Sequence, residues 1–198
     1  MQRDPRVGRI QSKARMPVRW RSELAAILIT RAQLEQRVRE LARIIQHDFT
    51  ERELVVVALL TGTIMFLADL IRRLTLPLRL DFIGVSSYGS RTEPGELHFT
   101  KELRLDVCGR DVLVVDDILD TGQTLSRVLA KLRLLEPRSI KVCVLLEKLA
   151  RRTENIQADY IGFSVPDLFV VGYGLDFAER YRNLPFIGVL KPEIYQAS

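Results

Sequence analysis

The segment with the clearest chemical potential spans residues 112–125, where three aspartates follow an apolar stretch. Asp116, Asp117 and Asp120 fill three of five successive positions, and carboxylates this close repel one another unless a cation or a hydroxyl-rich ligand is present. Thr121-Gly122-Gln123-Thr124 comes next, at the expected start of a helix. Free N–H groups, hydroxyls and the positive end of the helix dipole favour an anion such as phosphate there. The segment therefore predicts a sugar-phosphate site, in which the carboxylates meet ribose hydroxyls or Mg²⁺ and the helix start meets the phosphate.

Other interpretations of this segment explain less of it. Asp120 or Thr121 could simply cap the helix, with Asp116 and Asp117 as solvated loop acids, but a cap needs no further acids behind it. The chain contains neither G-x-x-x-x-G-K-[ST] nor G-x-G-x-x-G. Asp117 and Asp120 are one residue too far apart for the D-x-D pair of haloacid-dehalogenase phosphatases. The D-D-x-x-D acids of isoprenyl diphosphate synthases lie on a helix, whereas here a predicted strand precedes them.

The elements that must position these residues follow from hydrophobic periodicity. Thr30 and Gln33 form a capping box, which predicts the start of an amphipathic helix. The unbroken β-branched run Leu54–Leu60 is typical of a parallel strand covered on both faces. Patterns of this kind predict helices over residues 30–47, 64–74 and 125–135, and strands over 54–60, 78–87, 96–103, 111–115 and 139–146, with shorter strands near 158–163, 169–172 and 186–189. Residues 88–95 have loop composition.

Strands and helices alternate through the middle of the chain, which predicts an α/β domain with a mainly parallel sheet. Ligands of such sheets bind in a crevice beyond the carboxyl ends of the strands. Thr61-Gly62, Asp116-Asp117 and Glu147-Lys148 each follow a predicted strand closely. We therefore expect these three pairs to converge on one site.

The positive charge of the chain is concentrated near its beginning. The 198 residues include 30 basic and 25 acidic side chains, a net charge of +5, but residues 1–21 hold seven of the basic and only one of the acidic ones. The remainder is close to neutral, so we do not expect a nucleic-acid partner. We predict a basic, disordered extension over residues 1–22 and a single domain over residues 23–198.

Composition also narrows the class of protein and its compartment. A hydrophobic fraction of 47% excludes disorder of the whole chain, and the longest apolar run has seven residues, too short to span a membrane. Cys108 and Cys143 lack C-x-x-C spacing, which predicts reduced, buried or half-buried thiols in place of a disulfide or a metal site. We expect a cytoplasmic protein with no membrane partner.

Residues 114–124 resemble the phosphoribosyl-diphosphate (PRPP) motif of type I phosphoribosyltransferases, two hydrophobic residues and two acids followed by x-x-D-T-G-x-T. Further segments resemble the hypoxanthine-guanine phosphoribosyltransferases: residues 85–89 (VSSYG), 145–148 (LLEK), 166–176 (PDLFVVGYGLD), 181–184 (YRNL) and 187–192 (IGVLKP). The resemblance covers about residues 24–195. It implies a type I phosphoribosyltransferase-like α/β fold, with a mainly parallel sheet flanked by helices and a small hood over the carboxyl ends of the strands.

The resemblance implies an enzyme of purine salvage. Its reaction would be the Mg²⁺-dependent transfer of the 5-phosphoribosyl group from PRPP to hypoxanthine or guanine, giving IMP or GMP and diphosphate. Asp120 would act as the general base beside the imidazole ring of the purine, because departure of diphosphate builds positive charge on the ribose and the purine must be activated. The residues implied for PRPP and ribose phosphate are Asp116, Asp117, Asp120, Thr121, Gly122, Gln123 and Thr124.

The remaining implied roles concern the base, the diphosphate and the metal. The purine would contact Lys148, which donates to its 6-oxo group, Phe169, which stacks on it, and also Val170 and Asp176. The diphosphate would contact Thr61, Gly62, Ser87, Tyr88 and Arg182, with Ser87 and Tyr88 at the start of a mobile lid. The implied Mg²⁺ ligands are Asp116, Asp117 and Asp176. A homodimer or homotetramer is also implied.

Thr61 departs from the family pattern, which usually has Leu-Lys-Gly where this chain has Leu60-Thr61-Gly62. The backbone of that loop, commonly with a cis peptide, receives the diphosphate in the family, so we expect binding to survive but to be weaker without the lysine. The adenine branch typically has alanine at the position of Asp120, whereas acceptance of xanthine stays open. RNA-binding pyrimidine-operon attenuators share the fold and the PRPP motif but usually lack that acid, so Asp120, Lys148 and Asp176 together favour catalysis.

Overall fold

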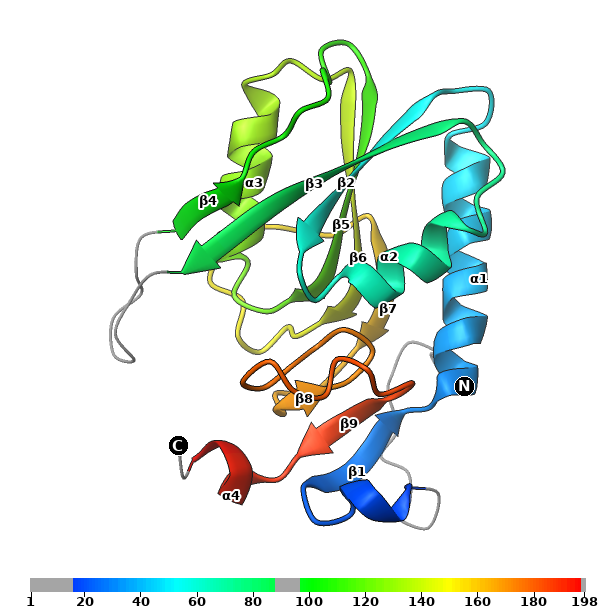
Figure 1. The fold of residues 1–198 in the computed structure, drawn as a ribbon. Helices are drawn as coiled ribbons and strands as arrows, with labels where there is room; N and C mark the ends of the chain where they lie inside the picture. The colour runs from blue at the N-terminus through cyan, green and yellow to red at the C-terminus, as the bar shows by residue number, and fades with distance from the viewer. Residues whose placement is uncertain (1–15, 88–96, 197–198) are drawn as a thin grey trace.

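The main sheet has six strands in the order β4-β3-β2-β5-β6-β7 (Figure 1). The computed structural model describes residues 16–87 and 97–196. Five strands run parallel and β4 runs antiparallel to β3: β2 (Leu54–Leu60), β3 (Leu78–Ser87), β4 (Leu97–Lys101), β5 (Asp111–Leu119), β6 (Ser139–Glu147) and β7 (Tyr160–Ser164). In β2 the first six residues are buried, as expected of a parallel strand covered on both faces. The predicted α/β class and parallel sheet are confirmed.

Helices cover both faces of this sheet. The helix α1 (Arg31–Asp48) begins at the predicted capping box, where Gln33 N–H donates to the Thr30 hydroxyl and the Gln33 side chain accepts from Thr30 N–H. It packs with α2 (Ile64–Ile71) on one face, whereas α3 (Gln123–Arg133) covers the opposite face. Each fully buried leucine in these layers contributes about 1.5–3 kcal/mol by leaving water. The two layers therefore hold the strand ends in fixed relative positions.

A second, antiparallel sheet of three strands forms the hood, in the order β1-β9-β8. It consists of β1 (Leu24–Ile29), β8 (Val170–Val171) and β9 (Ile187–Leu190), with the short helices η2 (Val18–Trp20) and α4 (Pro192–Tyr195) beside it. Figure 1 shows it below the carboxyl ends of β5, β6 and β7. The predicted hood is therefore present, at the predicted end of the main sheet.

The short helices η2 and α4 were not predicted, and the largest differences in the remaining elements concern β1, α2 and β5. No strand was expected over Leu24–Ile29, but this run pairs with β9, far along the chain. The helix α2 ends at Ile71, and the predicted continuation to Leu74 is a turn. The strand β5 extends beyond Val115 to Leu119, so Asp116 and Asp117 lie within the strand and not after it. The predicted loop over residues 88–95 lies outside the described residues.

The packed domain begins before the predicted boundary at residue 23. Met16 is 2% exposed and lies in a cluster with Leu24 and Tyr181, while the Trp20 and Tyr181 rings are 5.7 Å apart. The hood therefore includes residues 16–22, which the sequence had assigned to the extension. Residues 1–15 lie outside the described part of the chain. No helix among the described residues is long and apolar enough to cross a membrane. Cys143 is buried as predicted, but Cys108 is exposed, and both are free thiols.

Candidate active site at the end of the parallel sheet

The site lies where β5 separates from β2. These two strands pair from Leu54 and Asp111 up to Ala58 and Val115, whereas β5 stays paired with β6 as far as Leu119 and Glu147. The chain also reverses direction across the sheet here, since β3 lies on one side of β2 and β5 on the other. Such a switch point leaves a crevice at the carboxyl ends of the strands. A cavity of about 330 Å³ occupies it, lined mainly by residues 59–63, 116–122, 124 and 125.

Asp116 and Asp117 form the acidic wall of this cavity. Asp116 is buried, and its Oδ1 accepts hydrogen bonds from Asp117 N at 2.9 Å and Thr63 Oγ1 at 3.4 Å. Burial raises the pKa of Asp116 well above its usual range, and the neighbouring Asp117 raises it further. Burial also raises the pKa of Asp117. Two carboxylates in this state gain from a cation or from hydroxyl donors, which are the ligands that the sequence predicted.

The loop after β2 lies against this acidic pair. Its Leu60–Thr61 peptide is cis, as in the family pattern. A methyl group at Gly62 would lie 1.7 Å from Asp117 Oδ2, and one at Gly174, whose φ is +104°, would lie 1.9 Å from the Gly62 oxygen. The loop is therefore clamped between a carboxylate and a second backbone segment, and neither glycine can carry a side chain without displacing a neighbour.

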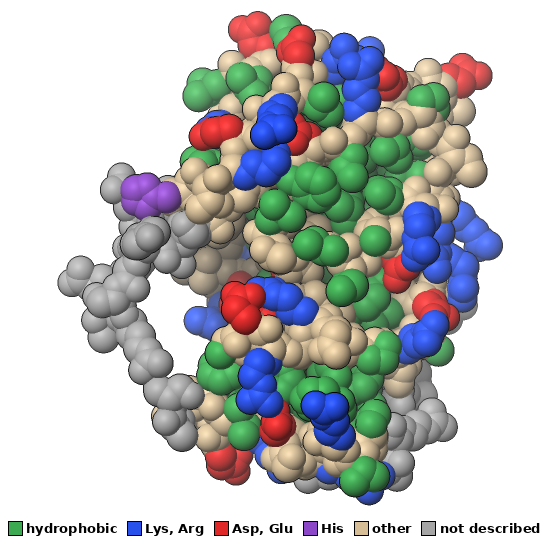
Figure 2. Space-filling view, in the orientation of Figure 1, with side chains coloured by type: hydrophobic (Ala, Val, Ile, Leu, Met, Phe, Trp, Pro, Cys, Tyr) green, Lys and Arg blue, Asp and Glu red, His purple; other side chains and the backbone are tan. Residues whose placement is uncertain are grey.

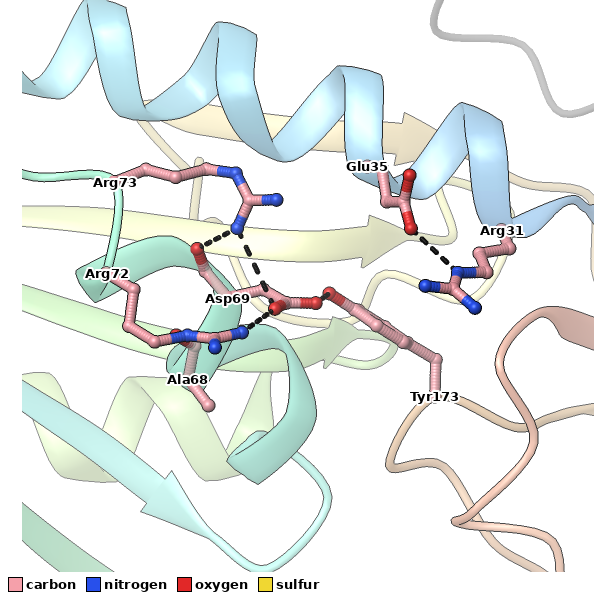
Figure 3. A network of polar contacts seen from close by, with 7 residues as sticks. All are labelled: Arg31, Glu35, Ala68, Asp69, Arg72, Arg73 and Tyr173. Atoms are coloured by element: carbon pink, nitrogen blue, oxygen red, sulfur yellow. Dashed lines mark hydrogen bonds and ion pairs between the residues drawn. The ribbon is translucent and has the colours of Figure 1, made fainter.

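A polar network behind the loop holds the segment that carries Gly174. Tyr173 donates from its hydroxyl to Asp69 Oδ2 at 2.6 Å, joining this segment to α2 (Figure 3). Asp69 also pairs with Arg72 at 2.5 Å and lies 3.7 Å from Arg73, and the Arg31–Glu35 pair of α1 lies close by. Burial and the bond to Asp69 raise the pKa of Tyr173, so its hydroxyl stays protonated and keeps donating. The network fixes the distance between the two backbones that meet at Gly62.

The predicted phosphate cradle is the start of α3. Gly122 is its N-cap, with φ +90°, and has no side chain to cap the helix, although the Thr121 hydroxyl accepts from Gln123 N–H at 3.4 Å. The start of a helix presents N–H groups without intrahelical partners, together with the positive dipole end, to an anion. Thr121, Gly122 and Thr124 line the cavity, whereas the Gln123 side chain is exposed and does not. Three of the four cradle residues therefore face the site.

Asp120 and Lys148 lie next to each other because of the strand register. Leu119 pairs with Glu147 across β5 and β6, and Lys148 N–H donates to the Leu119 oxygen at 3.0 Å. The residues that follow the two strands are thus brought together. Of the three pairs expected to converge, Thr61-Gly62 and Asp116-Asp117 line the cavity, whereas Glu147-Lys148 does not. Asp120 lines the cavity, whereas the Lys148 side chain, 7% exposed, lies beside it and reaches Asp167 at 3.5 Å.

Arg182 and Asp176 reach the cavity from the segment between β8 and β9. Arg182 Nη1 lies 3.0 Å from Asp176 Oδ1 and donates to the Gly174 oxygen at 2.8 Å, and Arg182 Nη2 lies 2.9 Å from Glu179. Asp176 is therefore paired with a cation of the chain and stands apart from Asp116 and Asp117. Within residues 16–87 and 97–196, no three His, Cys, Asp or Glu side chains come close enough together to hold a metal ion.

Some predicted contacts are not part of this cavity. Phe169 stacks on Tyr195, with ring centroids 4.7 Å apart, and touches Phe177 edge-on at 5.5 Å. Val170 is buried in β8 and pairs with Val189. Ser87 ends β3, but its side chain and all of Tyr88 lie outside the described residues, so the predicted lid stays a prediction.

The structure adds residues that the sequence did not indicate. Thr153 and Glu154 donate their N–H groups to the Thr121 oxygen at 3.0 and 3.1 Å, and Arg152 packs against Gly122. This segment therefore holds Thr121 and Gly122 of the predicted phosphate cradle in place. Arg151 and Asp167 lie beside Asp120 and Lys148. The signal in the sequence was the basic pair Arg151-Arg152, three residues after Lys148. Charged loop residues are ordinarily solvated, so spacing alone could not place this pair at the site.

Comparisons with known proteins agree with this arrangement. The family model described as "Phosphoribosyl transferase domain" matches residues 27–178. A hypoxanthine-guanine phosphoribosyltransferase of Bacillus subtilis is 43% identical over 176 residues, which cover 88% of this chain and 98% of that protein. A solved hypoxanthine phosphoribosyltransferase of Staphylococcus aureus is 41% identical with a TM-score of 0.86, covering 91% of this chain and 98% of that one.

A third relative is longer. The chain is 47% identical over 175 residues to a protein of Listeria monocytogenes named "Bifunctional protein TilS/HprT", of which it spans only 27% while 88% of this chain is covered. The two relatives that this chain covers almost completely, the family model and the site at the switch point all indicate the same family. The chain therefore belongs to the phosphoribosyl transferase family, in its hypoxanthine-guanine branch.

Proposed function

We propose that this chain transfers the 5-phosphoribosyl group of PRPP to hypoxanthine or guanine, forming IMP or GMP and diphosphate, as an enzyme of purine salvage. The observation that carries the proposal is the cavity at the switch point. It joins the acid pair Asp116-Asp117, the start of α3 and Asp120 within one space of about 330 Å³. A sugar that bears phosphate and hydroxyl groups matches the first two features, and a base with an acidic N–H matches the third.

The bond changes assign a task to each group. Purine N9 forms a bond to the anomeric carbon while the bond from that carbon to diphosphate breaks, and the electron pair of the broken bond leaves with diphosphate. Asp120 takes the proton of the imidazole ring, so the purine does not become cationic. Lys148 donates to the 6-oxo group, which adenine lacks, and in this way selects the base. Phe169 and Val170 contact the base, a role that requires the hood to approach the cavity.

The phosphate groups have separate partners in the proposal. Residues 120–124 wrap the 5′-phosphate with N–H groups and hydroxyls, and the loop Thr61-Gly62 receives the diphosphate. Arg182, 24% exposed at the cavity, neutralises part of the diphosphate charge. Asp116 and Asp117 accept hydrogen bonds from the ribose hydroxyls. Developing negative charge on the leaving group is thus met by fixed donors, which is the main way such a site lowers the barrier.

We also propose Mg²⁺ as the metal. Mg²⁺ is commonly bound through one or two carboxylates together with substrate oxygens and water, without a complete cage of protein ligands. Asp116 and Asp117 fit that pattern because their two carboxylates lie side by side at the cavity, where burial raises the pKa of both. Asp176 would hold a second Mg²⁺ ion, and would be free to do so only if Arg182, which pairs with it at 3.0 Å, turned to the diphosphate. When bound, Mg²⁺ would offset the charge of PRPP and of the departing diphosphate.

We further propose that the chain assembles with copies of itself, as a homodimer or homotetramer. The exposed side chains Ile64 and Met65 of α2 are each 41% accessible, and the half-buried Leu80 and Phe82 of β3 lie at the margin of the same core. Figure 2 shows hydrophobic side chains gathered over the part of this face where β3 and α2 lie in Figure 1. Apolar surface of this kind gains from burial against a second copy. Light scattering of the protein and of Met65→Glu tests this: a dimer that the substitution dissociates supports it, and a monomeric wild type contradicts it.

We place the reaction in the cytoplasm, where thiols such as the exposed Cys108 and the buried Cys143 stay reduced. The proposed activity is tested by incubating the protein with PRPP, Mg²⁺ and each of hypoxanthine, guanine, xanthine, adenine and uracil, and following nucleotide formation by absorbance. We expect turnover with hypoxanthine or guanine and none with adenine or uracil. Absence of turnover with every 6-oxopurine would contradict the proposal.

A further inference from the structure

Four charged side chains of alternating sign form a chain beside the cavity. Asp120 Oδ2 lies 3.4 Å from Arg151 Nη1, and Arg151 Nε lies 4.0 Å from Asp167 Oδ1. The same Asp167 oxygen lies 3.5 Å from Lys148 Nζ. One guanidinium and one carboxylate thus connect the two residues assigned to the purine, Asp120 and Lys148.

The chain of charges is built on the ends of three adjacent parallel strands. Asp120 directly follows β5, Lys148 and Arg151 follow β6, and Asp167 follows β7. Backbone bonds hold these ends together: Lys148 N–H donates to the Leu119 oxygen at 3.0 Å, and Val165 N–H donates to the Glu147 oxygen at 2.9 Å. The positions of Arg151 and Asp167 therefore follow from the sheet, and do not depend on a free surface loop.

Burial makes the two ends of this chain of charges sensitive to their partners. The Lys148 side chain is only 7% exposed, and a buried ammonium is costly unless a carboxylate accompanies it. Asp120 Oδ1 is buried and has no hydrogen-bond partner within the described part of the chain, so the contact of Oδ2 with Arg151 is what orients the carboxylate. The two connecting residues, each 51% exposed, can be changed without opening the core.

We propose that Arg151 and Asp167 are positioning residues of the purine site, which hold Asp120 and Lys148 at the spacing needed to contact one edge of the base. The inference rests on the proposed function. Arg151 orients the carboxylate that takes the imidazole proton, so its loss reduces the rate of the chemical step. Asp167 holds the ammonium that donates to the 6-oxo group, so its loss weakens binding of the base. Neither residue contacts PRPP, whose binding is unaffected.

The test compares Arg151→Met and Asp167→Asn, which keep side-chain volume and shape, with Arg79→Met as a matched control. Arg79 is 49% exposed and pairs with Glu53 at 2.9 Å at the opposite ends of the strands. We expect kcat of Arg151→Met to fall about tenfold and KM of Asp167→Asn for hypoxanthine to rise about tenfold, the effect of losing roughly 1.4 kcal/mol of a charge-assisted contact. KM for PRPP stays within about twofold, and Arg151→Lys recovers part of kcat.

A double variant adds a second readout. Because the two residues act through one connected set of charges, the combined loss in kcat/KM for hypoxanthine is expected to be smaller than the product of the single losses. Values of both single variants within about twofold of Arg79→Met, in a protein that turns over hypoxanthine, would overturn this inference alone. A rise in KM for PRPP together with a lower Tm would also overturn it, since that result marks a structural role. A wild type without 6-oxopurine turnover would overturn the proposed function and this inference with it.

Discussion

Replacing Gly62 with alanine tests the clamp that holds the loop after β2. The added methyl group would lie 1.7 Å from Asp117 Oδ2, and its next backbone neighbour, the Gly174 oxygen, is at an ordinary 3.6 Å. A carbon and an oxygen in contact need more than 3 Å, so the Asp117 carboxylate must move by about 1.5 Å. The clash thus falls on one functional side chain and leaves the surrounding backbone in place.

The expected effect is large on activity and small on stability. A displacement on the order of 1 Å in a positioned group can cost about 10²-fold in rate, so we expect kcat/KM for PRPP to fall by about that factor. Overpacking costs about 1–3 kcal/mol, whereas loss of a glycine stabilises by about 0.4–1 kcal/mol through the unfolded chain. The free energy of unfolding should therefore fall by no more than about 2.6 kcal/mol.

Steady-state kinetics with varied PRPP, together with urea unfolding, separates these effects. Gly109→Ala is the control, because nothing lies within 4 Å of its added methyl group, yet its φ of +65° makes alanine strained. It should lose about 1–2 kcal/mol of stability, comparable with Gly62→Ala, but keep normal kinetics. Adding Gly62→Ala to Asp117→Ala should cost little further activity, since the displaced carboxylate is already gone. A folded Gly62→Ala protein with kcat/KM for PRPP within twofold of wild type would show that the Asp117 carboxylate is not needed at its observed position.

Three further predictions concern the loop, the pH dependence of stability and the domain boundary. Thr61→Lys places a cation at the cavity, where the diphosphate is proposed to bind. It should lower KM for PRPP by up to about tenfold, which corresponds to one charge-assisted contact. An unchanged KM in initial-rate measurements would contradict the role of this loop. Burial raises the pKa of Asp81, but bonds from Lys101 Nζ and from the N–H groups of Arg104 and Leu105 outweigh it, so the net pKa is well below the usual range. A carboxylate with a lowered pKa stabilises the fold above about pH 4, and this stabilisation is lost as the pH falls. Asp81→Asn should therefore lower the free energy of unfolding by about 1–3 kcal/mol at pH 7 and by less at pH 3, as measured by urea unfolding. An equal loss at both pH values would contradict this prediction. Deleting residues 1–15 should leave Tm unchanged, whereas deleting residues 1–21 removes the buried Met16 and should lower it; equal Tm values in differential scanning calorimetry would show that the Met16 contact is dispensable.

Elements whose signals are local could be predicted from the sequence. The capping box at Thr30 places the start of α1, and the apolar runs place β2 and β3 at their observed bounds. The strand β1 could not be predicted in this way, because it depends on pairing with β9, more than 150 residues away. The strand β5 was expected to end at Val115 because aspartate disfavours strands, but pairing with β6 continues through Leu119 and overrides that preference.

The candidate site, too, could be predicted where its signals are local and not where they depend on strand pairing. The types and spacing of Asp116, Asp117 and Asp120 were sufficient to predict an acidic wall beside an anion cradle, since both follow from one short segment. The contacts of Arg151 and Asp167 could not be predicted, because they depend on the register of β5, β6 and β7. Tertiary pairing therefore determines which loop charges belong to the site.

The proposed role of Asp120 is tested most directly by Asp120→Ala, with Asp106→Ala, a surface aspartate that caps Cys108 N–H, as the control. The measurement is kcat with hypoxanthine under saturating PRPP and Mg²⁺, alongside the calorimetric Kd for PRPP. A general base contributes on the order of 10²-fold or more, so kcat should fall by at least that factor while Kd stays within a few fold and the control is unchanged. An Asp120→Ala protein that retains the wild-type kcat would contradict the assignment of the catalytic site to the end of β5.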